Sequence, residues 1–203
     1  MQFETERLIL RAWHPNEDAR NAMDIYSDAR VMNWIEPSGV KDGSIREVQR
    51  RLQRYVDQST RAKNGTRSWA VVQKDIGRVI GALVLATLPD MAEVRPGHVP
   101  EPIEGGCSPE YIEIGWHFRP ASWGYGYATE AAVCVVQHSF ETLELPMLLA
   151  VTQPDNSRSV RLIERLGMEY DGMTTRCYGG EPLLLYRLTA AAFDKVERFS
   201  VER

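Results

Sequence analysis

The sequence has few cysteines, no long apolar run and no excess of basic residues. Its three cysteines, Cys107, Cys134 and Cys177, are odd in number and widely spaced, so they indicate neither a disulfide framework nor a metal-binding knuckle. No apolar stretch approaches membrane-spanning length, and Glu4 and Glu6 stand where a secretory signal would carry basic residues. The net charge of -4 argues against nucleic acid as a main partner. These absences predict a cytoplasmic location, with no membrane, metal or nucleic acid partner.

The composition is that of an ordinary globular chain. Hydrophobic residues make up 43% and charged residues 26% of the 203 residues, and no internal repeat is visible. A chain of this length would bury roughly 70% of the surface that it exposes when unfolded. We therefore predict a single domain over 1–203, with its core at about 5–190. Residues 88–110 are too rich in proline and glycine for regular structure and are predicted to form a loop insertion.

The segment 111–131 carries the most information, because the spacing of its apolar residues changes from a strand period to a helix period. Over 111–118 apolar and polar side chains alternate, as in a strand with two different faces. Gly124 and Gly126 then permit backbone angles that side chains disfavour, and from Ala128 apolar residues recur at helical spacing. The apolar face comprises Ile112, Ile114, Trp116 and Phe118, and the opposite face carries Glu113 and His117.

A strand that leads through glycines into a helix can form a cradle for a phosphate. The first amides of the helix are unpaired and point into the loop, where the positive end of the helix favours an anion. A dinucleotide-binding fold would need a third glycine where Thr129 stands, and a P-loop would need lysine and serine or threonine after Gly126. Tyr127 and Ala128 follow instead. The pattern therefore predicts a loop that grips a pyrophosphate with backbone amides.

The rest of the sequence predicts a mixed order of strands and helices. Strands are expected where apolar residues alternate or form short runs, and helices where they recur at three- and four-residue steps. Ser44 and Glu47 match a capping box that opens a helix running to about Thr60. The expected strands are 6–13, 68–73, 79–88, 111–118, 147–152, 168–173 and 183–188, and the expected helices are 16–26, 44–60, the helix from Ala128, and 157–166.

Together these motifs resemble the GNAT superfamily of acyl-CoA-dependent N-acetyltransferases, and within it the RimJ/RimL-like branch. The agreement is collinear over nearly the whole chain, and it is specific because the glycine loop stands among several other matching motifs. These motifs are TERLILRAW, VIGALVL, EIGWHFRPASWGYGYATEA, LLAVTQPDNSRSVRLIERLGM and LLLYRL. The resemblance implies an α/β (α+β) fold with a central mixed, mostly antiparallel, twisted sheet, which has flanking helices and is splayed at the acyl-CoA-binding strand.

The resemblance also implies acetyl-CoA as co-substrate, without a metal. The usual loop pattern of the family is Gln/Arg-x-x-Gly-x-Gly/Ala, and Ala121 stands at its first position, so only the amide cradle is implied. Asn156 suits a helix N-cap and, by the resemblance, also faces the pantetheine or the acceptor. The residues implied to contact acetyl-CoA are Ile114, Gly115, Trp116, Trp123, Gly124, Tyr125, Gly126, Tyr127, Ala128, Thr129, Asn156 and Ser159.

The chemistry would need a base, because an amine acceptor arrives protonated, with a reference pKa near 8 for an α-amine and about 10.4 for lysine. Glu113 is the best candidate for this base, and the alternative is a solvated glutamate on a half-exposed strand. The family often has a tyrosine acid where Ile163 stands, so the resemblance suggests Ser159 as the acid, against a purely structural serine. The acceptor pocket is implied to include Tyr26, Glu36 and Trp34, of which Trp34 equally suits the core.

The sequence thus predicts an acetyl-CoA-dependent N-acetyltransferase that works by direct attack in a ternary complex. Its predicted partners are acetyl-CoA and a primary amine; the negative charge mildly favours cationic acceptors, and a homodimer is a possibility. Two alternatives stay open: a non-catalytic acyl-CoA-binding module that regulates, and an enzyme with a different acyl donor or an oxygen acceptor. A protein N-terminus, a polyamine, an amino acid and an aminoglycoside all remain candidate acceptors.

Overall fold

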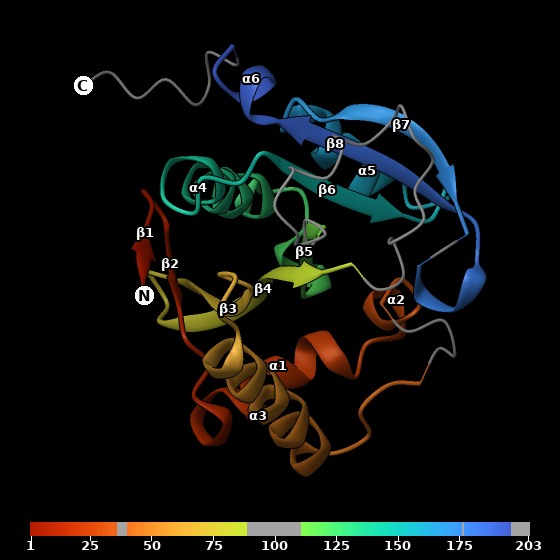
Figure 1. Ribbon diagram of the computed structural model, residues 1–203. Coiled ribbons are helices and arrows are strands. Elements are labelled where there is room, and N and C mark those ends of the chain that lie inside the picture. The colour runs from red at the N-terminus through yellow and green to blue at the C-terminus, as the bar shows by residue number, and fades with distance from the viewer. Residues whose placement is uncertain (36–39, 89–110, 176, 196–203) are drawn as a thin grey trace.

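A single mixed sheet organises the residues that the computed structural model describes, which are 1–35, 40–88, 111–175 and 177–195 (Figure 1). The strand order is β1-β2-β3-β4-β5-β6-β8-β7, and every neighbouring pair is antiparallel except β5 and β6. The predicted mostly antiparallel sheet is therefore confirmed. The strands are β1 Phe3–Glu4, β2 Leu8–Arg11, β3 Arg67–Gln73, β4 Arg78–Thr87, β5 Ile112–Phe118, β6 Met147–Thr152, β7 Glu169–Thr174 and β8 Leu183–Thr189.

Helices cover both faces of this sheet. Figure 1 shows α1 and α3 on one side of β3 and β4, with α4 on the other. Apolar residues of α1 and α3 pack on Ala70 and Ala82 in one buried cluster, while those of α4 and α5 pack on Ile114 and Leu148 in another. The helices are α1 Pro15–Tyr26, α2 Ala29–Met32, α3 Ile45–Arg61, α4 Tyr127–Glu141, α5 Ser157–Arg165 and α6 Ala190–Phe193, with single 3-10 turns η2 Pro120–Ser122 and η3 Tyr178–Gly180.

Strand β5 separates two chemical environments, as its alternation predicts. Ile112, Ile114 and Phe118 belong to the buried cluster under α4 and α5. Glu113 pairs across the sheet with Leu149 of β6, so both side chains point to the opposite face. Leu149 belongs to a third apolar cluster, formed mainly by β6 and β8. Glu113 is therefore a carboxylate placed on an otherwise apolar part of the sheet.

The sheet opens between β5 and β6. Strand β4 pairs with β5 along its whole length, from Ile112 to Phe118. Strand β6 pairs with β5 only at Glu113 and Leu149. Beyond Glu113 the edge of β5 that faces β6 therefore has no strand partner among the described residues, which is the predicted splay. An unpaired strand edge presents backbone donors and acceptors that a ligand can use.

Most predicted elements occur within a few residues of their expected bounds. The strand expected at 6–13 is the shorter β2, Leu8–Arg11. The helix expected at 44–60 is α3, which begins as predicted after Ser44, whose hydroxyl accepts from the Glu47 N–H at 3.3 Å. The strand β1, the helices α2 and α6, and the two 3-10 turns were not predicted, because two to four residues are too short to show a period. Apart from Leu88, the predicted insertion 88–110 lies outside the described residues.

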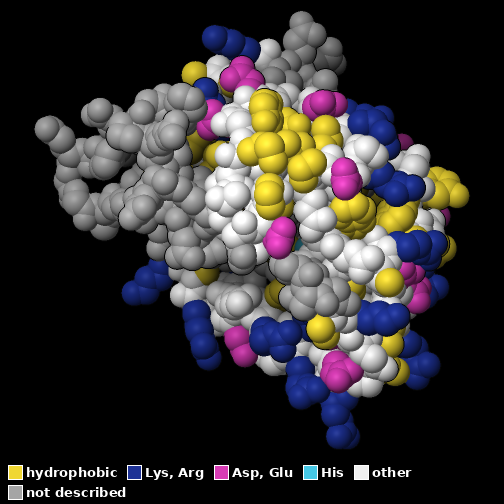
Figure 2. Space-filling model, turned by 90° about the vertical axis from the view of Figure 1, so that its right-hand side faces the viewer, with side chains coloured by type: hydrophobic (Ala, Val, Ile, Leu, Met, Phe, Trp, Pro, Cys, Tyr) yellow, Lys and Arg dark blue, Asp and Glu magenta, His cyan; other side chains and the backbone are white. Residues whose placement is uncertain are grey.

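Strand β7 forms an exposed edge of the sheet. Tyr170 and Met173 on this strand are each 57% exposed. Figure 2 looks toward this side of the molecule and shows hydrophobic side chains gathered on its upper part. Exposed apolar side chains on a sheet edge are typical of an interaction surface, and the homodimer suggested by the sequence stays a prediction. Among the described residues, no helix is long and apolar enough to span a membrane.

Candidate active site

The loop between β5 and α4 has the backbone shape of an anion cradle. Gly124 and Gly126 have φ values of 86° and 81°, in the left-handed region that side chains disfavour. Gly126 is the N-cap of α4 and offers no side-chain cap, so the N–H groups of the first helical turn keep no partner within the helix. In the described part of the chain, a Cβ added at Gly124 would meet no heavy atom within 4 Å beyond those of its two chain neighbours. The loop thus combines free amide donors with open space.

Trp123 fastens this loop to its surroundings. Its indole Nε1–H donates to the Phe118 carbonyl at the end of β5 at 2.8 Å. The guanidinium of Arg158, from the first turn of α5, lies 4.7 Å from the centre of the indole ring. The indole therefore contacts both the end of β5 and the start of α5. The glycine loop and the segment around Asn156, which were both predicted to bind acetyl-CoA, come together at this side chain.

The start of α5 is capped as the sequence predicts. The Asn156 side-chain oxygen accepts from the Ser159 N–H at 3.2 Å, which confirms the N-cap. Ser159 is 9% exposed and shares a buried helix face with Ile163, which is fully buried. Ile163 thus places a core side chain at the position where the family often carries a tyrosine, and Ser159 lies four residues before it on the same buried face.

Glu113 is a buried carboxyl group with a perturbed acidity. Its side chain is 8% exposed, so the solvated glutamate considered from the sequence is wrong. Burial in this apolar part of the sheet raises the pKa of Glu113 to about 8. No described residue forms a hydrogen bond or ion pair with its carboxylate. A group of this kind takes up and releases a proton near neutral pH.

Beside Glu113 the sheet surface is open. Gly115 shares the face of Glu113 and His117, because the three alternate along β5. Apart from its two chain neighbours, no described residue would place a heavy atom within 4 Å of a Cβ added at Gly115. Val84, its partner on β4, is also only partly buried. Glu113 and His117 therefore lie on one face of β5, as the alternation predicts, at the two ends of an open surface at Gly115, which we call the open floor. The open floor itself was not predicted from the sequence.

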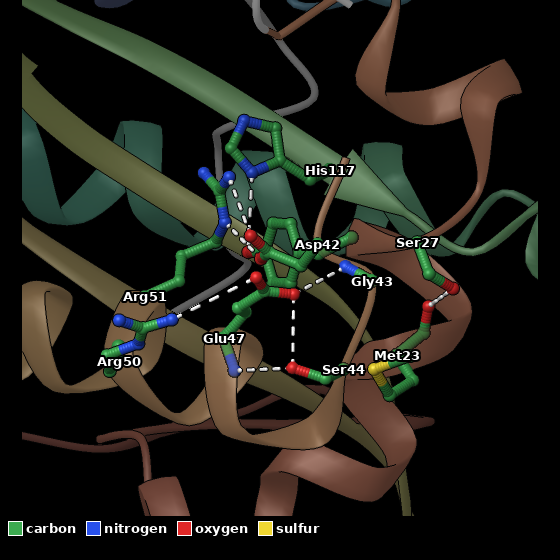
Figure 3. Close-up of polar contacts among 10 residues, drawn as sticks. Met23, Ser27, Asp42, Gly43, Ser44, Glu47, Arg50, Arg51 and His117 are labelled. Carbon is green, nitrogen blue, oxygen red and sulfur yellow. Dashed lines mark hydrogen bonds and ion pairs between the residues drawn. The ribbon is translucent and has the colours of Figure 1, made fainter. Parts of the chain in front are cut away.

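His117 contacts a buried polar cluster at the far end of this floor. Its Nδ1 lies 3.5 Å from the Tyr26 hydroxyl, and the Arg51 guanidinium lies 5.1 Å from the centre of the Tyr26 ring. Arg51 also donates from Nε to Asp42 at 2.7 Å, as Figure 3 shows. Burial, assisted by the positive charge of Arg51, lowers the pKa of His117 to about 4. The imidazole is therefore neutral at physiological pH.

The three residues expected in an acceptor pocket have different surroundings. Tyr26 is fully buried, and its hydroxyl lies 3.5 Å from Nδ1 of His117. Trp34 is 40% exposed, so its alternative assignment to the core is wrong. Glu36 lies outside the described residues. Asp42 donates its N–H to the Tyr26 carbonyl at 2.9 Å and forms an ion pair with Arg51.

Comparison with known proteins agrees with this geometry. The family described as "Acetyltransferase (GNAT) domain" matches residues 7–169. A relative in Bacillus subtilis (strain 168), "Uncharacterized N-acetyltransferase YnaD", is 25% identical over 87% of this chain and 88% of its own length. The solved structure of an acetyltransferase (GNAT family) from Bacillus anthracis superposes with a TM-score of 0.71 at 24% identity, covering 94% of this chain and 99% of that one.

The chain belongs to the GNAT family of acetyltransferases, since the family match spans most of its length. It is therefore an enzyme of acetyl transfer, and its splayed sheet and glycine loop are the family's fold. The structure of "Ribosomal-protein-S5-alanine Acetyltransferase" from Vibrio fischeri is similar as well, with a TM-score of 0.68 at 18% identity over 94% of this chain and 97% of that one. This likeness shows that the two proteins share a fold.

Proposed function

We propose that this enzyme transfers the acetyl group of acetyl-CoA to a primary amine by direct attack in a ternary complex. The observation that carries the proposal is the position of Glu113, a buried carboxyl group at the point where β5 and β6 separate and beside the open floor at Gly115. A base for an amine and an open strand edge for an acyl donor thus occur at one place on the sheet.

The described residues fit acetyl-CoA. Amide donors and left-handed glycines at Gly124 and Gly126 suit a pyrophosphate, and a Cβ at Gly124 would occupy space that is open. The unpaired edge of β5 beyond Glu113, at Ile114 to Trp116, suits an amide-containing arm such as pantetheine. When bound, acetyl-CoA supplies a thioester whose carbonyl accepts the nucleophile. The residues proposed to hold it are those of the loop 123–129, the edge 114–116, and Asn156 with Ser159 at the start of α5.

Glu113 would take the proton that the amine must lose. With a pKa of about 8, its carboxyl group is nearly matched to an α-ammonium group, whose pKa is about 8. Proton transfer from a lysine ammonium would be uphill by about 2.4 pKa units, or roughly 3 kcal/mol. An acceptor of low basicity, such as a protein N-terminus or an amino acid, therefore loses its proton to Glu113 at less cost than a lysine side chain does.

Ser159 would act at the sulfur that leaves. Its hydroxyl belongs to the first turn of α5, which the Arg158–Trp123 contact holds beside the glycine loop. A hydroxyl there can donate a proton to a departing thiolate. His117, held neutral beside Tyr26, would line the acceptor side of the floor together with Trp34.

Two experiments test this function. Acetyl-CoA at a hundredfold excess over its Kd should raise the free energy of unfolding by about 2.7 kcal/mol, and NAD or ATP should raise it much less. A panel of amines, including N-terminal peptides, amino acids, polyamines and aminoglycosides, is then incubated with acetyl-CoA, and the release of free thiol is measured. Equal stabilisation by NAD would refute the cofactor assignment.

The same assay separates the alternatives when hydroxyl substrates without a free amine are added to the panel. A regulatory acyl-CoA-binding module would be stabilised by acetyl-CoA but release no thiol with any amine. An enzyme with an oxygen acceptor would release thiol with hydroxyl substrates that carry no free amine. The measurement to make first is thiol release with a free α-amine, because this class of amine loses its proton to Glu113 at the least cost.

A further inference from the structure

We propose that Arg7 is a positioning residue for the pyrophosphate end of the acetyl-CoA site, an inference that rests on the function proposed above. Arg7 lies just before β2, more than a hundred residues from the glycine loop in the sequence. Its guanidinium donates from Nε to Glu130 Oε2 at 2.7 Å and from Nη1 to the Tyr125 carbonyl at 3.0 Å. These two contacts tie the turn between β1 and β2 to both sides of Gly126.

The first consequence concerns the direction of a backbone amide. In a trans peptide the carbonyl and the N–H point in opposite directions, and no described peptide bond is cis. Because Arg7 holds the Tyr125 carbonyl, the N–H of Gly126 must point away from Arg7. A Cβ at Gly126 would lie 3.5 Å from Arg7 Nη2, and the guanidinium covers the Tyr127 ring at 4.6 Å. Arg7 thus covers the outer side of the loop and directs a donor inward.

The second consequence concerns charge. The Glu130 carboxylate lies in the first turn of α4 and accepts hydrogen bonds from the Thr5 hydroxyl, the Arg7 N–H and the Arg7 side chain. Burial alone would raise the pKa of Glu130, but these hydrogen bonds and the charge of Arg7 outweigh burial and lower it. Glu130 is therefore ionised at neutral pH. Arg7 neutralises a fixed negative charge that would otherwise repel a bound pyrophosphate.

The two partners should therefore respond in opposite directions when each is neutralised. Arg7→Met exposes the charge of Glu130 and releases the Tyr125 carbonyl, so the Kd for CoA should rise by about tenfold. Glu130→Gln removes the negative charge and leaves Arg7 cationic, so the Kd should stay level or fall by up to about threefold. Both variants lose the same ion pair, and both should melt at a lower temperature than the parent.

The test measures the Kd of CoA by calorimetry for the parent, Arg7→Met, Glu130→Gln and the double variant. The double variant should bind CoA about threefold more tightly than Arg7→Met, because the repelling charge is gone. Arg11→Met is the matched control: it breaks the Arg11–Asp18 ion pair at the other end of β2, so it should lower the melting temperature without changing the Kd. If Arg7→Met does not fold, Arg7→Lys replaces it, with about threefold weaker binding expected.

The outcomes are distinct. A parent protein that does not bind CoA would refute the proposed function, and the role of Arg7 with it. A parent that binds CoA, with an Arg7 variant that binds equally well at a lower melting temperature, would show that Arg7 only fastens the fold. Weakened binding in Glu130→Gln as well as in Arg7→Met would also overturn the proposal, because loss of a structural contact acts in the same direction from either side.

Discussion

Replacing Glu113 by Gln tests whether a buried carboxyl group with a raised pKa lies at the site. In the folded state its pKa is about 8, against an ordinary value of 4.5. As the pH rises above 4.5 the unfolded chain releases this proton while the folded chain keeps it. The folded state of the parent therefore loses stability between pH 4.5 and 8, and the Gln variant does not.

The size of the effect follows from the shift. We compare the free energy of unfolding of the Gln variant with that of the parent and take their difference at pH 4 as the reference. This difference should move in favour of the Gln variant by roughly 1, 3 and 4 kcal/mol at pH 5.5, 7 and 8.5. Urea unfolding of both proteins at these pH values measures the gain. Glu141→Gln, at an exposed glutamate at the end of α4, is the control and should give parallel curves. A difference between Glu113→Gln and the parent that does not change with pH would refute the reasoning.

The same variant tests the catalytic role. Glu113→Gln should lower kcat on a reactive amine by roughly 10²–10⁴ at neutral pH with little change in acetyl-CoA affinity. The loss should shrink at high pH, where free amine is already present. In the parent, the rate should rise with pH toward a plateau above about 8, as Glu113 becomes ionised. An equal loss at every pH would indicate acceptor positioning and not proton transfer.

Three glycine and serine changes test the rest of the site. Gly126→Val should abolish stabilisation by acetyl-CoA and lower the free energy of unfolding by roughly 1–2 kcal/mol. The control Gly77→Val, also at positive φ but in the β3–β4 turn, should lower the free energy of unfolding and still be stabilised by acetyl-CoA. If acetyl-CoA stabilises Gly126→Val as much as the parent, the phosphate cradle lies elsewhere. Gly115→Val fills open space, so it should change the free energy of unfolding by less than about 1 kcal/mol while slowing acetyl transfer. The control Gly81→Ala puts a Cβ 2.5 Å from the Phe118 ring and should destabilise the fold. Full activity in Gly115→Val would show that neither substrate binds over Gly115. Ser159→Ala should lower kcat by less than Glu113→Gln does, and an unchanged kcat would make Ser159 purely structural.

Local features were predictable where one segment carries its own period. The alternation over 111–118 predicted which side chains of β5 face the helices, and the left-handed glycines before α4 were expected from Gly124 and Gly126. The N-caps at Ser44 and Asn156 were also predictable, because a cap depends on residues only three positions apart. Short elements such as α2 were not predictable, because its four residues contain barely one helical turn and show no period.

Features that join distant segments were not predictable in this way. Glu113 could be proposed as a base, but its burial depends on the neighbouring strands and on what covers that face, so the rise of its pKa was not visible in the sequence. Arg7 and Glu130 stand 123 positions apart, and no spacing rule relates them. The cluster of His117, Tyr26 and Arg51 likewise forms only when α1 and α3 pack on β5.

The sequence by itself determined the family, the order of strands and helices, and the glycine loop, because short-range periods and backbone preferences are properties of a few neighbouring residues. Only the tertiary structure decided that β5 and β6 part at Glu113, that the surface at Gly115 is open, and that Arg7 faces the Tyr125 carbonyl. Acidity, open space and charge compensation depend on which distant atoms come within a few ångströms of one another. Those distances are set by packing, and no local pattern records them.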